Sequence, residues 1–477
     1  MSLLITKTSH PLKNGTVRST LVCEIPDAAV VEQRVTALLA ISHERVEAAC
    51  DYILAHFQQW HKHLPETLLS YFEKVSANLP AHVNTSGLSL TQKLLVGACF
   101  TRVDYLNDAS YFSPALIPAP YQYGLENGAR RFLLSYGVKS EARRFLAFAE
   151  VTLTGQDTEG FQVDMEQADT LAYPRRHQIK CHARTDFLES VVRCGVSVEE
   201  QHWIKERLSE DFEMEELDAL LEHDALSEPS RTVLKTLKTT LKDSFSLVFK
   251  REHRLQDRLL PLRALSAMAW SSFDATYHVL MYSKTEDSQH GGQQMLTTSD
   301  FLSFENASFE YYGEMLAEVE SFCLFPAEVY GQYWFMGVHV EKGLLVFPSC
   351  SPYFVQTHPE NVKALNLSPE VWEINGYSLC GAPLKTEAGW LVLTEGHGPM
   401  GTRSLGAFLL DNDDPTKVIG KLEKPLHQTR QLLGGGSFCG SGWIEKDVLL
   451  VPCLTESKIE IFQWHLAGIL ELLTPDS

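Results

Sequence analysis

Five short hydrophobic runs that resemble one another constrain the fold more than any other feature of the sequence. The runs are FLLSYG after Arg131, YHVLMYS after Thr276, YWFMG after Gln332, WLVLTEG after Gly389 and VLLVPC after Asp447. Their first residues are 132, 277, 333, 390 and 448, so the last four runs begin 56, 57 and 58 residues apart. A repeat of this length suits a four-stranded propeller blade with long loops. Evenly spaced strands also occur in β-sandwiches, but the repeat favours a mainly β fold with a five-bladed propeller.

Two parts of the chain have a helical pattern instead. From residue 27 to about 80, apolar residues recur at helical spacing, as in Val31, Val35 and Leu38. We therefore expect an α-helical N-terminal segment over residues 1–90, followed by the propeller over 91–477. The interval between the first two runs is too long for one blade, and residues 185–245 within it are charged and amphipathic. They predict a helical insertion between the first two blades.

The composition excludes several classes of partner. The 477 residues include 61 Asp and Glu against 41 Lys and Arg, which gives a formal net charge of −20. Nucleic acids and anionic membranes require a basic surface, so neither is expected as a partner, whereas a neutral sugar is not excluded. The ten cysteines show no C-x-x-C spacing and the histidines no ligand spacing, so no metal and no cofactor are expected. Reduced thiols and the lack of a signal-peptide core predict a cytoplasmic protein.

The stretch Cys380–Leu426 points to a family. Its elements GAPLKTEAGWLVLTEG, SLGAFLLD and DPTKVIGKLEKPL resemble glycoside hydrolase family 130, as do FSPALIPAPYQYGLENGARRFLLS from Phe112 and LFPAEVYGQYWFM from Leu324. That family contains phosphorylases and hydrolases of β-mannosides, built on a five-bladed propeller. The resemblance covers roughly residues 90–470, with the helical insertion in the expected place. It implies a mannose-containing glycoside as ligand, held at the top of the propeller axis.

The resemblance also shows where this chain departs from the family pattern. In the family, an aspartate donates a proton, and Arg, Lys and His side chains bind the attacking phosphate, whose negative charge requires several cations. The positions that the resemblance assigns to these residues and to an asparagine are occupied here by Ser266, Ala267, Met268, Ala269, Glu320, Val338, Leu379 and Glu395. Cations are thus replaced by neutral or acidic residues, and like charges in a shared pocket repel phosphate. Phosphorolysis is therefore not expected.

Two carboxylates are candidates for a remaining catalytic pair. Glu395 stands where the family has a histidine, and as the base of an inverting hydrolase it would activate water. Asp274 is the nearest carboxylate to the missing proton donor, although an ordinary turn aspartate is the alternative. The expected substrate-binding residues are Trp372, Glu373, Lys385, His397 and Arg403. Trp372 can either stack on a sugar ring or pack between blades, and the sequence leaves both open.

Three functions follow from this pattern. The first is a propeller with a degenerate catalytic site that binds a carbohydrate or a partner. The second is an active inverting glycoside hydrolase acting on β-mannosides or related glycosides, with Glu395 as base. The third is a non-catalytic subunit that pairs with an active relative, or with itself, through its N-terminal helices. The sequence leaves open whether the protein is an enzyme, and which sugar it binds.

Overall fold

The structure is a computed structural model of the 477-residue chain. It describes the following residues: 4–6, 12–13, 19–23, 25, 28–39, 41–58, 61, 63–80, 82–85, 87–105, 110–140, 143–157, 160–166, 171–242, 244–262, 265–273, 277–284, 293–308, 310–312, 319–339, 342–349, 352, 354–356, 359–365, 367, 370–373, 375–398, 402–429, 439–455 and 458–473. Asp274 lies outside them. The chain forms two units, one made of residues 1–14, 109–167 and 174–477, and the other of residues 15–108 and 168–173.

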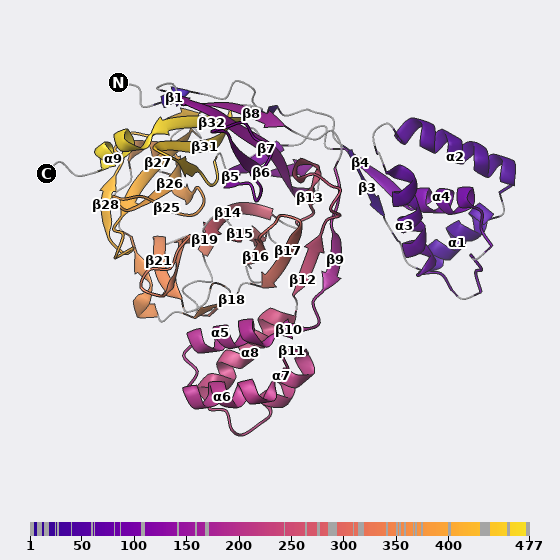
Figure 1. The fold of residues 1–477 in the computed structure, drawn as a ribbon, viewed down its shortest axis with the longest axis horizontal. Helices are drawn as coiled ribbons and strands as arrows, with labels where there is room; N and C mark the ends of the chain where they lie inside the picture. The colour runs from indigo at the N-terminus through magenta and orange to yellow at the C-terminus, as the bar shows by residue number, and fades with distance from the viewer. Residues whose placement is uncertain are drawn as a thin grey trace. The chain divides into compact units, whose positions relative to one another are not determined.

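The larger unit is a five-bladed β-propeller (Figure 1). Each of the five hydrophobic runs forms the second strand of a blade, which confirms the predicted propeller. These strands are β6 (Arg130–Ser140), β15 (Tyr277–Lys284), β20 (Tyr333–His339), β26 (Trp390–His397) and β31 (Val448–Thr455). They give the strongest sequence signal because a strand in the middle of a blade is buried on both faces, as the burial of seven of the eight residues of β26 illustrates.

The other strands complete the blades in order around the ring. Blade 1 adds β5 (Ser110–Pro118), β7 (Arg143–Asp157), β8 (Gly160–Glu166) and β13 (Leu259–Leu260). Blade 2 adds β14 (Leu265–Phe273), β16 (Gln293–Thr298), β17 (Ser303–Ser308), β12 (Phe245–Val248) and β9 (Arg175–Gln178). Blade 3 adds β19 (Val319–Leu324), β21 (Gly343–Ser349) and β23 (Lys363–Ala364). Blade 4 adds β24 (Tyr377–Leu379), β25 (Leu384–Lys385), β27 (Arg403–Leu410), β28 (Val418–Lys421) and β29 (His427–Thr429). Blade 5 adds β30 (Trp443–Glu445), β32 (Lys458–His465), β1 (Leu4–Thr6) and β2 (Leu12–Lys13).

Smaller elements connect or flank the blades. They are the parallel pair β18 (Glu310–Tyr312) and β22 (Phe354–Gln356), helix α9 (Leu466–Leu473), and the 3-10 turns η1 (Leu255–Asp257), η3 (Pro359–Asn361) and η4 (Val371–Glu373).

Both ends of the chain contribute to blade 5. β1 and β2 pair antiparallel with β32, so the first strands of the chain complete the last blade.

Across the centre of the ring, Ser441 links three blades. Its carbonyl oxygen accepts a hydrogen bond from the backbone N–H of Leu116 at 2.9 Å, and its Oγ accepts one from the N–H of Trp270 at 3.1 Å. A hydrogen bond that satisfies a buried backbone group favours this closed arrangement of the inner strands.

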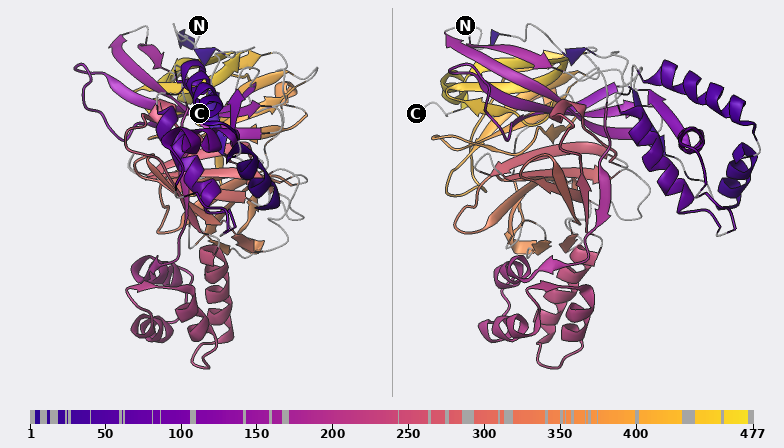
Figure 2. Two further views of the ribbon diagram at one scale, coloured as in Figure 1. Left: turned by 90° about the vertical axis from the view of Figure 1, so that its right-hand side faces the viewer. Right: turned by 45° about the vertical axis from the view of Figure 1, so that its right-hand side comes forward.

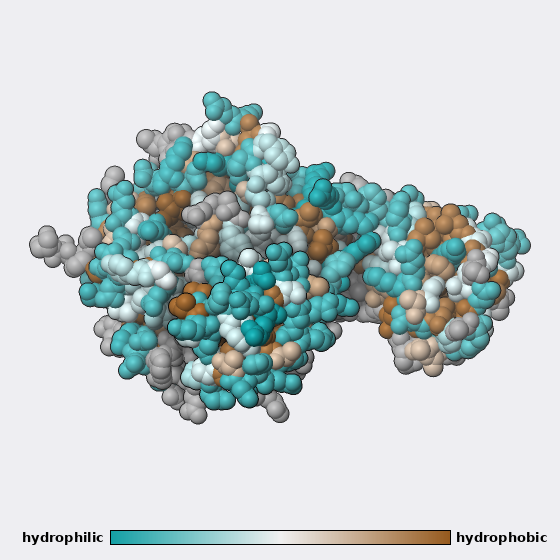
Figure 3. Space-filling view, turned by 60° about the horizontal axis from the view of Figure 1, so that its bottom comes forward, coloured by the Kyte–Doolittle hydropathy of each residue, from teal (hydrophilic) through white to brown (hydrophobic). Residues whose placement is uncertain are grey.

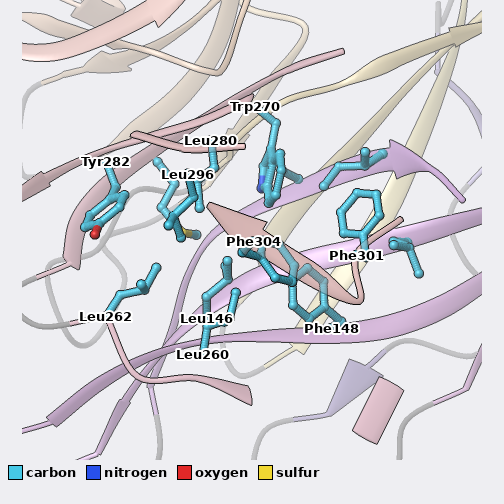
Figure 4. Close-up of a cluster of buried hydrophobic side chains, with 14 of the residues drawn as sticks. Leu146, Phe148, Leu260, Leu262, Trp270, Leu280, Tyr282, Leu296, Phe301 and Phe304 are labelled. Atoms are coloured by element: carbon cyan, nitrogen blue, oxygen red, sulfur yellow. The ribbon is translucent and has the colours of Figure 1, made fainter. Parts of the chain in front are cut away.

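The propeller is held together by apolar contacts between neighbouring blades. Figure 4 shows the cluster between blades 1 and 2, where Phe148 from β7 meets Phe301 from the β16–β17 turn and Phe304 from β17. The ring of Phe301 lies edge-on to that of Phe148 with centroids 6.0 Å apart, a favourable aromatic geometry. Trp270 on the inner strand β14 packs against the same cluster, and its Nε1 donates to Ser135 Oγ at 3.0 Å. Blade 2 is thereby fixed to blade 1 close to the centre of the propeller.

Four helices interrupt the chain between β9 and β12. They are α5 (Arg184–Arg193), α6 (Val198–Arg207), α7 (Met214–Leu221) and α8 (Glu228–Lys242), with the short pair β10 (His182–Ala183) and β11 (Asp211–Phe212). Figure 2 shows them as a small bundle of their own. Its core is apolar, with Phe212, Leu217 and Leu234 fully buried.

The second unit contains α1 (Ala28–Leu39), α2 (His43–Phe57), α3 (Leu64–Ser76) and α4 (Leu90–Cys99), with β3 (Ser19–Cys23) paired to β4 (Thr101–Tyr105). Val31, Val35 and Val75 are fully buried in its core. On the face of this unit seen in Figure 3, several hydrophobic residues lie close together at the surface. Among the described residues of the whole chain, no helix is both long enough and apolar enough to cross a bilayer.

Candidate functional site

Three of the predicted site residues meet at one end of β26 and β27. Glu395 and His397 alternate along β26 and therefore face the same side, and His397 pairs directly with Arg403 on β27. Arg403 Nη1 donates to Glu395 Oε1 at 2.9 Å. The Glu395 side chain has no exposed surface, whereas that of Arg403 is 23% exposed. Glu395 is thus a buried carboxylate whose counter-ion extends toward solvent.

The surroundings of Glu395 are thiols from the interface between blades 4 and 5. Cys380 follows β24, and its backbone N–H donates to Leu393 O on β26 at 2.9 Å. Cys439 and Cys453 belong to blade 5 and face each other in a β-bridge. A carboxylate oxygen of Glu395 and the sulfurs of Cys380 and Cys439 all lie within 4.8 Å of one another. Burial is the main cause that raises the pKa of all three thiols, and the charge of Glu395 raises it further.

His397 is a neutral neighbour of this carboxylate. Its Nε2 lies 3.8 Å from Glu395 Oε1 and 3.2 Å from Ser378 Oγ, and its side chain is 35% exposed. Burial, and then the charge of Arg403, lower the pKa of His397 to about 4. The distance to Glu395 would allow an ion pair, but a histidine with this pKa is uncharged at neutral pH. Arg403 is therefore the cation that neutralises Glu395.

Trp372 and Glu373 pack against the end of β26 that carries Glu395 and His397. The Trp372 indole is buried, and its Nε1 donates to Glu423 O at 3.1 Å. Its ring lies so close to Gly396 and Gly406 that a Cβ at these glycines would come within 2.5 and 2.2 Å of it. Glu373 is buried as well and is bonded to Lys421. Neither side chain offers a free surface to a sugar.

The remaining substrate-binding candidate, Lys385, lies at the opposite end of β26. It pairs with Trp390, and its ammonium lies 5.4 Å from the centre of the Trp390 ring. Trp390 precedes Glu395 by five residues, which corresponds to roughly 16 Å along a strand at about 3.3 Å per residue. Lys385 and Glu395 therefore cannot contact the same monosaccharide. The structure brings five of the seven predicted residues together, leaves Lys385 apart and does not describe Asp274.

A cavity of about 360 Å³ lies at the centre of the propeller and is lined by all five blades. We call it the axial cavity. Its lining residues are Leu116, Trp270, Ser271, Ser272, Pro326, Ala327, Ala382, Pro383, Leu384, Lys385, Ser441, Gly442, Trp443 and Ile444. Of the side chains described around it, that of Lys385 is the single charged one, and none is a carboxylate.

The axial cavity and the Glu395 region lie at different ends of the inner strands. In blade 4, Ser378 pairs with Glu395, whereas the cavity-lining Leu384 pairs with Leu391 farther along the blade. In blade 2, the cavity is lined by residues 270–272, near the end of β14, whereas Ser266 lies at its start. The positions that the family resemblance assigns to the catalytic site therefore lie at one end of the propeller axis. The axial cavity lies at the other end.

Sequence reasoning singled out Lys385 from the axial cavity and Glu395 from the thiol cluster, and it missed the other residues of both. Ser271 lies in β14 and Ser441 just before β30, and small residues of this kind carry no chemical signature of their own. Cys380, Cys439 and Cys453 lack metal-ligand spacing because the chain crosses from blade 4 to blade 5 between them. Trp443 could have been found from the sequence. It is an aromatic residue at the start of the short strand before VLLVPC, and this strand faces the centre of the propeller.

His278, which is hydrogen-bonded to the cavity-lining Ser272, should make the stability of the protein depend on pH. Its side chain is fully buried, its Nδ1 is hydrogen-bonded to Ser272 Oγ at 2.8 Å, and burial lowers its pKa to about 4. The unfolded chain takes up this proton near the ordinary pKa of about 6.5. Between about pH 6.5 and 4 the unfolded state therefore binds more protons, and stability falls as the pH falls. Urea unfolding from pH 7.5 to 4.5 should show this loss, and His278→Gln should reduce its slope. An unchanged slope would mean that His278 is solvated.

Comparisons with known proteins agree with the sequence resemblance. No family model matches the chain. It is 29% identical over 155 residues to a β-1,2-mannobiose phosphorylase of Listeria innocua, covering 32% of this chain and 41% of that protein. It is 28% identical over 103 residues to a 1,2-β-oligomannan phosphorylase of Thermoanaerobacter, covering 22% of this chain and 33% of the relative. The matches thus span less than half of either relative.

Several solved structures align with most of this chain, but their sequence identities and TM-scores are low. The β-1,2-mannobiose phosphorylase of Listeria innocua in complex with β-1,2-mannobiose has a TM-score of 0.40 and 14% identity, covering 76% of this chain and 93% of that one. A putative glycoside hydrolase from Parabacteroides distasonis has a TM-score of 0.44 and 12% identity, covering 76% and 89%. The assignment of the chain therefore rests on the sequence matches and the motifs of blades 1, 3 and 4. They show a similarity to β-1,2-mannoside phosphorylases that fits the resemblance of these motifs to glycoside hydrolase family 130.

Proposed function

We propose that this protein is a non-catalytic propeller that binds a mannose-containing saccharide in its axial cavity without cleaving it. The observation that carries the proposal is the burial of Glu395. An inverting hydrolase needs a base that contacts water, opposite an acid roughly 6.5–9.5 Å away. Glu395 has no exposed surface, and its Oε1 accepts from Arg403. A carboxylate held in this way stabilises the blade interface and cannot activate a water molecule beside a sugar.

Phosphorolysis is disfavoured by the same pair. Phosphate binding requires a group of cations that is not already neutralised. The guanidinium of Arg403 is paired with Glu395, and the ammonium of Lys421 is bonded to Glu373. His397, with its pKa lowered to about 4, adds no positive charge at neutral pH. The cations near the end of β26 are therefore engaged with carboxylates of the chain itself.

The axial cavity has the properties of a site for a small neutral ligand. Its volume of about 360 Å³ falls within the usual range of roughly 300–1,000 Å³ for ligand pockets. Its lining residues include two tryptophans, Trp270 and Trp443, and three serines, Ser271, Ser272 and Ser441. The Ser271 Oγ is buried and has no hydrogen-bond partner among the described residues. A buried hydroxyl without a protein partner favours a ligand that supplies one. The names of the curated relatives make β-1,2-mannobiose the first saccharide to test.

Calorimetric titration with β-1,2-mannobiose tests this proposal. We expect saturable binding, and a stabilisation of about 2.7 kcal/mol when the sugar is at 100 times its Kd. Trp443→Ala should weaken binding at least tenfold, because Trp443 lines the axial cavity. Trp203→Ala is the matched control: this partly buried tryptophan belongs to the helical insertion, and its loss should leave the Kd unchanged. Equal binding by the wild type and Trp443→Ala, or no binding by the wild type to β-1,2-mannobiose and longer β-1,2-mannosides, would contradict the proposal.

A cytoplasmic location is part of the proposal. The nine cysteines within the described residues are all free thiols. Free thiols persist in reducing compartments. Pairing with an active relative through α1–α4 is compatible with sugar binding and would appear as a larger mass in light scattering of the purified mixture.

A further inference from the structure

The thiol cluster between blades 4 and 5 has a composition that neither sugar binding nor packing explains. It consists of Cys380, Glu395 and Cys439, whose ligand atoms lie within 4.8 Å of one another. All three side chains are at most 1% exposed. They come from three separate segments, namely the loop after β24, the strand β26 and the segment that precedes β30. Buried apolar interfaces rarely contain a carboxylate, so a polar role for this group is expected.

We propose that Cys380, Cys439 and Glu395 bind a structural zinc ion that ties blade 4 to blade 5. Two sulfurs and one carboxylate oxygen form a donor set that Zn²⁺ accepts, and structural sites of this kind are closed to solvent. Tetrahedral zinc with Zn–S near 2.3 Å and Zn–O near 2.1 Å places its ligand atoms roughly 3.5–3.8 Å apart. The three atoms therefore need to approach one another by about 1 Å at most, which small side-chain rotations achieve.

The charge balance of the cluster fits a divalent cation. Without metal, Cys380 and Cys439 are free thiols that are hydrogen-bonded to each other. Glu395 is balanced by Arg403. Binding of Zn²⁺ forms two zinc–thiolate bonds and releases the two thiol protons to solvent, so the total charge of the buried group does not change. A site of low dielectric tolerates this exchange, whereas it would not tolerate an uncompensated ion.

Arg403 has a defined role in this site. A carboxylate has two oxygens, so Glu395 can accept from Arg403 Nη1 and still offer a lone pair to the metal. Hydrogen bonds from outer groups orient metal-bound carboxylates and are a regular part of zinc sites. Cys453 faces Cys439 in the β-bridge and is fully buried, so it is tested separately as a fourth donor.

A disulfide between Cys380 and Cys439 is the competing use of the same thiols. Disulfide formation would join only the two sulfurs and needs an oxidant, whereas a metal ion engages the carboxylate as well. A disulfide would also leave the position of Glu395 beside the sulfurs without a function. A zinc ion uses all three donors together, so we favour zinc binding over a disulfide.

The test uses the full chain, expressed with added zinc, purified without a metal-affinity step and dialysed against metal-free buffer. Mass spectrometry of the metal content should find about one zinc per chain. Cys380→Ala and Cys439→Ala should each lose the zinc, and Glu395→Gln should retain less than the wild type. Cys323→Ala is the matched control, since Cys323 is a fully buried thiol in blade 3 and its loss should leave the zinc content unchanged. Zinc loss in Cys453→Ala would add Cys453 as the fourth ligand, and full retention would limit the protein ligands to three; both support the site.

Two measurements on the wild type keep the proposal falsifiable if the alanine variants do not fold. Protein loaded with Co²⁺ should show thiolate-to-cobalt charge-transfer absorption in the near ultraviolet. Titration with a mercurial reagent should release the bound zinc as the thiols react. Wild-type protein without zinc or a cobalt signal would overturn the proposal, as would zinc that persists in the Cys380→Ala/Cys439→Ala double variant. An intact mass about 2 Da lower, with two thiols missing, would assign the cysteines to a disulfide instead.

Discussion

Replacing Arg403 by methionine is expected to lower the free energy of unfolding of the metal-free protein by about 3–5 kcal/mol. The substitution leaves Glu395 as a buried carboxylate without a counter-ion, among thiols that give little solvation. Urea unfolding followed by tryptophan fluorescence, in the presence of a chelator, measures the change. The size of this effect follows from the complete burial of Glu395 and not from the strength of surface ion pairs.

Two further variants identify the cause of that loss. Arg403→Met/Glu395→Met removes both charges and should recover most of the stability, because the apolar pair fills a similar volume. Arg130→Met is the control for an exposed ion pair, since Arg130 is 57% exposed where it contacts Glu445, and it should change stability by about 1 kcal/mol at most. A loss below 1 kcal/mol for Arg403→Met would mean that Glu395 is solvated, which would restore it as a candidate base.

Replacing Trp372 by alanine is expected to lower the free energy of unfolding by about 3–5 kcal/mol and to leave the affinity for sugar unchanged. The indole fills the space above Gly396 and Gly406, and its Nε1 donates to a backbone carbonyl, so its removal opens a cavity and leaves that carbonyl unpaired. Urea unfolding and sugar titration on the same variant measure both quantities.

Trp443→Ala provides the opposite pattern for comparison. Trp443 lines the axial cavity, so its loss should weaken sugar binding more than it weakens folding. If Trp372→Ala instead lost sugar binding while keeping the stability of the wild type, Trp372 would be a stacking platform for the sugar, and the role of the axial cavity would need revision.

The fold could be predicted from local patterns wherever burial is repetitive. The run WLVLTEG and its four counterparts are second strands, buried on both faces, and their spacing reveals the blades. The inner strands are harder to find, because β24 and β30 are only three residues long and contain Tyr, Ser, Trp and Glu. The pairing of β1 and β2 with β32 could not be predicted either, since it joins the two ends of the chain and leaves no local signal.

The candidate site was predictable in its members but not in its orientation. Alternation along β26 places Glu395 and His397 on one face, and the next strand brings Arg403 beside them. Whether that face points to the propeller axis or to the neighbouring blade depends on which segments pack against it. Cys380 and Cys439 decide this, and their contact with Glu395 depends on the assembly of blade 5 next to blade 4. Sequence spacing carries no record of that assembly.

The most direct test of the proposed function is a turnover measurement made under conditions where binding is observed. The purified chain is incubated with β-1,2-mannobiose, with and without inorganic phosphate, and mannose and sugar phosphate are quantified by anion-exchange chromatography. Calorimetry under the same conditions should detect the bound disaccharide, while neither product should rise above the level in a protein-free control. Formation of either product by the wild type, and its loss in Glu395→Gln, would contradict a non-catalytic propeller and would establish Glu395 as a catalytic residue.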